Sequence, residues 1–134
     1  MTDSSVMLTF DEAVDGMRDL CTRFPEVNER LSHHTPTFFV RDKKVLVHVW
    51  DHHHGDHGIA LWCAAPEGVQ AEVIEADPDR FFRPPYVGHR GWIGMRLDVG
   101  TVDWDEVFEV VADAYRMTAP KTLVRRFDET QAEA

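Results

Sequence analysis

The chain has 134 residues, of which 43% are hydrophobic and 10% aromatic, and it carries a formal net charge of −10. That length and composition suit one compact domain and exclude a chain that is disordered throughout. No apolar segment approaches the roughly 20 residues needed to cross a bilayer, and the first residues lack a signal-peptide pattern, so we expect a cytoplasmic protein with no membrane partner.

The first predicted helix begins after Thr9 and ends at Pro25. Thr9 and Glu12 form a capping-box pattern at its start. Apolar residues then recur at spacings of three and four, which is typical of one buried helix face: Phe10, Ala13, Val14, Met17, Leu20, Cys21 and Phe24. Cys21 and Cys63 both fall at apolar-patterned positions, so we expect two reduced core thiols and no disulfide.

Three β-rich runs follow, at residues 37–42, 43–50 and 59–64. The last two are joined by a polar, glycine-containing loop and therefore predict a hairpin. Alternation within the second run predicts one face with Val45, Val47 and Val49 and another with Leu46, His48 and Trp50.

Residues 65–77 predict a short helix, and residues 81–91, which contain two prolines, predict a rigid loop with at most a short edge strand. Residues 91–98 predict a further strand. Ile93, Met95 and Leu97 alternate along it with Trp92, Gly94 and Arg96.

The last long helix is predicted to begin near Asp103, which forms a second capping-box pattern with Glu106. Pro120 interrupts this helix, residues 121–127 suit a short helical turn, and we expect residues 128–134 to fray.

These elements predict an α+β fold: a two-layer domain in which the N-terminal and C-terminal helices pack on one face of an antiparallel sheet. The single domain spans residues 1–134, with a core from about 9 to 123. The sheet face away from the helices is then expected to expose aromatic and basic side chains, which marks a contact surface: His48, Trp50, Trp62, Trp92 and Arg96.

Two stretches, "RFFRPPYVGHRGWIGMRLD" and "WDEVFEVVADAYRMTAPKTL", resemble the MmcQ/YjbR-like family of small bacterial proteins. The earlier stretch "FFVRDKKVLVHVW" is similar to the central strands of that family. The resemblance covers residues 10–123 and implies a CyaY-like fold, also described as a double wing. It implies DNA binding and supplies no set of catalytic residues.

Residues 80–97 contain four arginines and no acidic residue, although the protein as a whole is acidic. Guanidinium groups pair with phosphate and aromatic rings stack on bases, so this segment and the tryptophan face predict a nucleic-acid or other anionic-ligand site. The alternative is structural, with the rings packed in the domain and the arginines paired to carboxylates. The candidate residues are Arg80, Arg83, Tyr86, His89, Arg90, Trp92 and Arg96, together with Trp50, Trp62 and His48.

The loop "HHHGDH", residues 52–57, offers His53, Asp56 and His57 as metal ligands. A solvated hairpin turn is the favoured interpretation, because no second pair of ligands elsewhere has matching spacing. We therefore expect no resident cofactor, and only adventitious zinc or nickel at this loop.

No nucleophile motif, phosphate-binding loop or dinucleotide fingerprint is present, so the sequence favours a non-enzymatic protein. The leading hypothesis is DNA binding through the arginine and tryptophan face, which reversing the charges of Arg90 and Arg96 should abolish. The alternatives are a small-molecule or metal site formed by the tryptophan face and histidine loop, or an aromatic homodimer interface.

Overall fold

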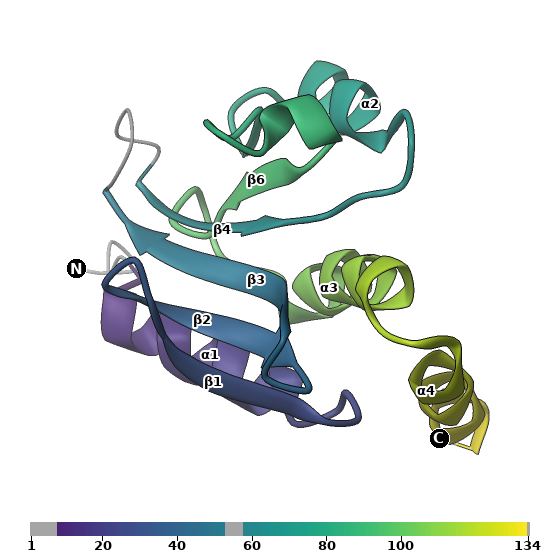
Figure 1. The fold of residues 1–134 in the computed structure, drawn as a ribbon. Helices are drawn as coiled ribbons and strands as arrows, with labels where there is room; N and C mark the ends of the chain where they lie inside the picture. The colour runs from purple at the N-terminus through teal and green to yellow at the C-terminus, as the bar shows by residue number, and fades with distance from the viewer. Residues whose placement is uncertain (1–7, 53–57, 134) are drawn as a thin grey trace.

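A computed structural model describes residues 8–52 and 58–133 and contains a six-stranded antiparallel sheet with the helices packed around it (Figure 1). The strands lie in the order β1-β2-β3-β4-β6-β5. The elements in chain order are α1 (Phe10–Cys21), β1 (Val27–Ser32), β2 (Thr35–Val40), β3 (Lys44–Asp51), β4 (Ile59–Cys63), α2 (Val69–Ala76), β5 (Phe81–Phe82), the short 3-10 helix η1 (Gly88–Arg90), β6 (Ile93–Arg96), α3 (Trp104–Thr118) and α4 (Lys121–Glu133). The predicted α+β architecture is confirmed.

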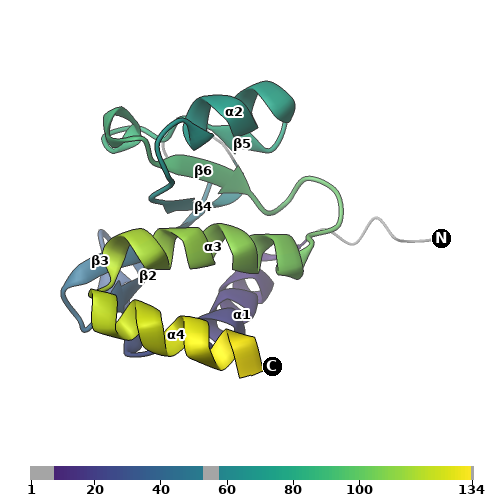
Figure 2. The ribbon, with the colours of Figure 1, turned by 90° about the vertical axis from the view of Figure 1, so that its right-hand side faces the viewer.

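Helix α1 forms as its sequence predicts. The Thr9 hydroxyl accepts a hydrogen bond from the Glu12 backbone N–H at 3.1 Å, and the Glu12 carboxylate accepts one from the Thr9 N–H at 2.9 Å. These two bonds satisfy donors that the first helical turn leaves without partners. The apolar face of α1 is buried together with α3 and α4, and the three helices cover one face of the sheet (Figure 2).

Two elements differ from the prediction. Strand β1 was not predicted, because its sequence VNERLS lacks apolar alternation; it pairs only with β2 at the edge of the sheet, where a polar strand is stable. Helix α4 continues through Glu133, whereas a short turn followed by a frayed tail was expected. It is held by Leu123 and Phe127, which are buried in the core between the helices and the sheet.

A β-bulge at Leu46 changes which side chains share a face of β3. Phe38 pairs with Val47 and Phe39 pairs with Val45, so Leu46 is an extra residue without a partner on β2. One inserted residue reverses the alternation beyond it. Leu46 consequently lies in the core under the helices, whereas Val45 packs with the tryptophans on the opposite face, the reverse of the predicted assignment.

The sheet is apolar on both faces. The main core lies under the helices, and Trp50, Trp62 and Trp92 form a second cluster, each with 4–7% of its surface exposed. Phe82 and Val87 pack against this cluster. The expectation that the tryptophans are exposed is therefore wrong, because they bury one another beneath the segment that joins β5 to β6.

Gly94 makes this second core possible, since a Cβ atom at this position would lie 2.3 Å from the Phe82 ring. We expect Gly94→Ala to lower the free energy of unfolding by about 1–3 kcal/mol, the usual cost of overpacking. Urea denaturation followed by tryptophan fluorescence would measure it. In a protein that already carries Phe82→Ala, which removes the ring, Gly94→Ala should cost much less stability than it does in the wild type. An equal cost in both proteins would contradict the proposed cause.

Candidate functional site

Two of the four arginines in segment 80–97 are neutralised within the fold. Arg80 donates to both carboxylate oxygens of Glu106, at 2.7 and 3.0 Å, and to Asp77 at 2.7 Å; these hydrogen bonds raise its pKa above the ordinary value. Glu106 therefore binds Arg80 rather than completing a capping box with Asp103. Arg96 pairs with Asp98 at 3.1 Å. For Arg80 and Arg96 the alternative interpretation, in which the arginines pair with carboxylates within the domain, is therefore the correct one.

Arg83 and Arg90 remain exposed, and neither has a carboxylate partner within the described ranges 8–52 and 58–133. Both belong to the loop between β5 and β6, which Gln70 fixes in place. The Gln70 amide donates to the carbonyl oxygens of Gly88 at 2.8 Å and Trp92 at 2.6 Å, and its oxygen accepts from Arg83 at 3.4 Å. The guanidinium of Arg90 lies 5.4 Å from the Trp92 ring centroid, within cation–π range.

Tyr86 and His89 lie on the same loop and point to solvent. Tyr86 has 74% of its surface exposed and adopts a positive φ of 68°. His89 is the exposed central residue of η1. The loop therefore presents a ring, an imidazole and two guanidinium groups on one rigid segment.

A pocket of about 510 Å³ runs along the tryptophan face and includes His48, Trp92 and Arg90. We call it the His48 pocket. Its other lining residues are Lys44, Val45, Ala64, Val87, Met117 and Thr118. None of the lining side chains is acidic, so both charged groups that open onto it, Lys44 and Arg90, are positive.

His48 lies among the tryptophans and is held by one hydrogen bond. Its Nδ1 atom is 3.1 Å from the hydroxyl of the buried Thr37, and its ring centroid is 6.3 Å from that of Trp92. Burial, with a smaller contribution from His33, lowers the pKa of His48 to about 4. The imidazole is therefore neutral at physiological pH.

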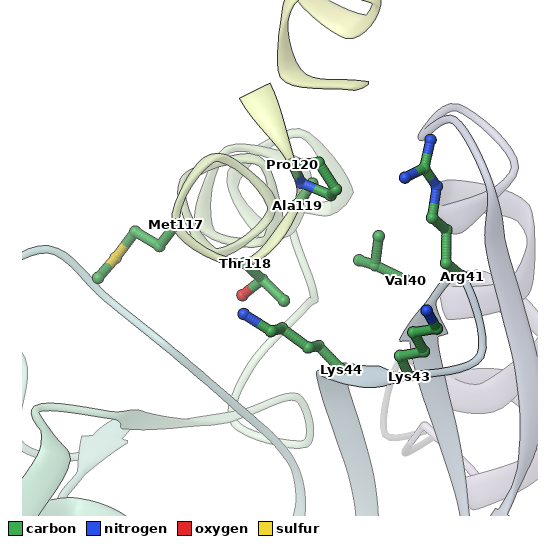
Figure 3. A pocket seen from close by; sticks show the side chains of 8 residues that line it. All are labelled: Val40, Arg41, Lys43, Lys44, Met117, Thr118, Ala119 and Pro120. Atoms are coloured by element: carbon green, nitrogen blue, oxygen red, sulfur yellow. The ribbon is translucent and has the colours of Figure 1, made fainter. Parts of the chain in front are cut away.

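A second pocket, of about 430 Å³, adjoins the first and is lined by the β2–β3 turn and the end of α3 (Figure 3). Arg41, Lys43 and Lys44 contribute its cations, and Figure 3 shows Lys44 extending toward Thr118. Arg41 is paired with Glu26 at 2.9 Å, whereas neither lysine has a carboxylate partner in the described part of the chain. Lys44, Met117 and Thr118 line both pockets, so the two pockets are neighbours.

Lys43, Lys44 and Arg90 are exposed cations that line the two pockets, and Arg83 is a fourth exposed cation on the same loop as Arg90. We call them the cationic surface. The two arginines were predicted from the sequence as binding residues, whereas the two lysines were not. The available signal was the dipeptide at residues 43–44, but nothing in the sequence placed that turn beside the loop.

The proposed metal ligands His53, Asp56 and His57 lie outside the described residues. Within the described ranges, no group of three or more histidine, cysteine or acidic side chains is placed to hold a metal ion. Cys21 and Cys63 are free and buried; burial raises the pKa of the Cys63 thiol to about 12 and that of Cys21 as well. Neither thiol is an activated nucleophile.

No helix in the described part of the chain is both long and apolar enough to cross a membrane. The family model described as YjbR matches residues 22–117. The crystal structure of Deinococcus radiodurans protein DR2400, with the family-model domain DUF419, is similar with a TM-score of 0.67 and 17% identity, covering 90% of this chain and 91% of that one. At that identity the likeness shows the fold alone. No curated protein matches the chain.

The lowered pKa of His48 predicts a pH-dependent stability. Unfolding restores its ordinary pKa of 6.5, so between pH 6.5 and about 4 the unfolded chain binds a proton that the folded one excludes. Stability is therefore full above pH 6.5 and falls as the pH decreases. We expect this residue to lower the free energy of unfolding by roughly 2–3 kcal/mol at about pH 4.5.

Urea denaturation at pH 7 and at about pH 4.5 would measure that loss in the wild type and in His48→Phe. Carboxylates titrate in both proteins, so the difference between them isolates the imidazole. An identical acid sensitivity of the two proteins would contradict the assignment of His48 as a buried neutral residue.

Proposed function

The chain belongs to the YjbR family, and we propose that it is a non-enzymatic protein that binds single-stranded DNA through the cationic surface. One observation carries the proposal. In a protein with a net charge of −10, three exposed cations without a described carboxylate partner, Lys43, Lys44 and Arg90, line two adjoining pockets that have no acidic lining residue. Such a local field attracts phosphate even when the average charge repels it.

The loop and the turn supply the types of group that a single-strand site uses. Guanidinium and ammonium groups contact the backbone, and exposed aromatic rings such as Tyr86 give the bases a stacking surface. Because Gln70 already holds the loop through three hydrogen bonds, little conformational entropy is lost when the ligand binds.

The helical side of the domain is unsuited to duplex DNA. A helix that enters the major groove must present cationic and polar side chains to the phosphates and base edges. Most solvent-facing positions of α1 and α3 are instead acidic, and the exposed Arg18 and Arg116 are paired with carboxylates. The exposed acids include Asp11, Asp15, Asp19, Asp105, Glu109 and Asp113. Single strands, which can reach the two pockets between the β2–β3 turn, the β5–β6 loop and the end of α3, fit the charge distribution better.

A second candidate is a small phosphate-bearing metabolite. The volume of the His48 pocket, about 510 Å³, lies in the usual range for small-molecule sites, and Lys44 and Arg90 would hold the phosphate. This candidate uses the same residues. It predicts that a mononucleotide-sized ligand binds with full affinity and that additional nucleotides do not increase the affinity.

Fluorescence anisotropy of a labelled single strand of about twelve nucleotides would test DNA binding. Four phosphate contacts predict that the logarithm of the affinity falls with the logarithm of salt concentration with a slope of about −3. Replacing two of the cations, Lys44→Gln with Arg90→Gln, should make the slope shallower by about 1.4 and weaken binding at low salt at least about tenfold.

The matched control is Arg23→Gln with Arg125→Gln, which removes the same charge from two exposed arginines outside both pockets. The control should retain the wild-type slope. Equal losses in the two double variants would mean that only the net charge matters and would contradict a local site. Tighter binding of duplex than of single strand would contradict the proposed mode.

A further inference from the structure

We infer that the His48 pocket takes one unstacked nucleobase, whose N–H donor is hydrogen-bonded to Nε2 of His48 while Lys44 and Arg90 hold the adjoining phosphate. This rests on the proposed function and deepens it: the cationic surface supplies sequence-independent affinity, and the pocket adds recognition of a base.

Two hydrogen bonds determine which ring nitrogen of His48 carries the proton. The Thr37 hydroxyl is 3.1 Å from the carbonyl oxygen of Thr35 and 3.1 Å from Nδ1 of His48. A carbonyl oxygen only accepts, so the single hydroxyl proton of Thr37 is donated to Thr35. The Thr37 oxygen then accepts, and Nδ1 of His48 must be the donor.

The other nitrogen, Nε2, is consequently a bare acceptor. Within the described ranges no hydrogen bond to this nitrogen is found, and the imidazole stays neutral because burial among Trp50, Trp62 and Trp92, with a smaller contribution from His33, disfavours its charged form. An acceptor in such an environment binds an N–H or O–H donor and does not bind a phosphate oxygen, which also accepts. The anion therefore belongs at the other end of the pocket.

The two ends of the pocket differ in chemistry. Lys44 lies four residues before His48 on the same strand, with the bulge at Leu46 between them, and Arg90 lines the pocket from the β5–β6 loop. Val45, Ala64 and Val87 add apolar side chains to the lining. A ligand that contacts both ends has a flat apolar body with an N–H donor at one end and an anionic group at the other, as a nucleotide does.

Thymine is the sharpest probe, because N3–H is its only ring or exocyclic N–H donor once the base is attached to the sugar. Three strands of equal length and charge would be compared: oligothymidylate, its N3-methylthymine analogue and an abasic strand. We expect both altered strands to bind the wild type roughly tenfold more weakly, since each leaves Nε2 without a partner.

His48→Phe should bind oligothymidylate and its N3-methyl analogue equally, because the acceptor is gone. Equal binding of those two strands by the wild type would overturn the inference and leave the proposed function standing. Failure of all three strands to bind at low salt would overturn both. A salt-dependent slope in His48→Phe equal to that of the wild type would confirm that the phosphate contacts are separate from the base contact.

The tautomer is measurable without any ligand. Nitrogen-15 NMR of the histidine side chains distinguishes protonated from bare ring nitrogens, and we expect His48 to carry its proton on Nδ1 at neutral pH. Thr37→Val removes the acceptor for that proton and should allow the Nε2–H form to appear. A wild-type His48 protonated on Nε2 would overturn the inference even if every variant proved unstable.

Discussion

The packing of Trp50, Trp62 and Trp92 on the side of the sheet away from the main helical core is the constraint on which the rest of the structure depends. Three large rings on that face must be shielded from water, and the β5–β6 segment lies over them through Phe82 and Val87. That requirement explains why the loop is anchored by Gln70. It also explains why a histidine in the same cluster remains neutral, because the environment penalises its charged form.

The charges are separated between the two sides of the domain. The exposed acids of α1 and α3 lie over the main core. Several arginines, such as Arg80 and Arg18, form ion pairs with carboxylates of the protein itself. Lys43 and Lys44 at the turn, and Arg83 and Arg90 in the loop, have no such partners among the described residues. A molecule with a net charge of −10 can thereby present one surface that attracts anions, and the acidic remainder opposes phosphate binding elsewhere.

Local patterns predicted the helices and most strands, because the capping box of α1 and the alternation of β4 depend on neighbouring residues. The polar edge strand β1 has no such pattern, and the bulge at Leu46 arises from pairing with a distant strand. The site was predicted only in part, because some of its residues are brought together by the tertiary fold and not by a local pattern. Arg90 was recognised from its acid-free segment, but Lys44 joins it only through the tertiary fold, and charge counting could not show that Arg80 is neutralised.

The central claim is that a neutral histidine and unpaired cations form one ligand-binding surface on the tryptophan face. Chemical-shift mapping of the nitrogen-15-labelled protein, titrated with a short single-stranded oligonucleotide, tests it most directly. The account predicts that the largest shifts occur at Lys44, Val45, His48 and Arg90 and at the indole N–H of Trp92. Shifts concentrated on α1 and α3, or no shifts at low salt, would contradict it.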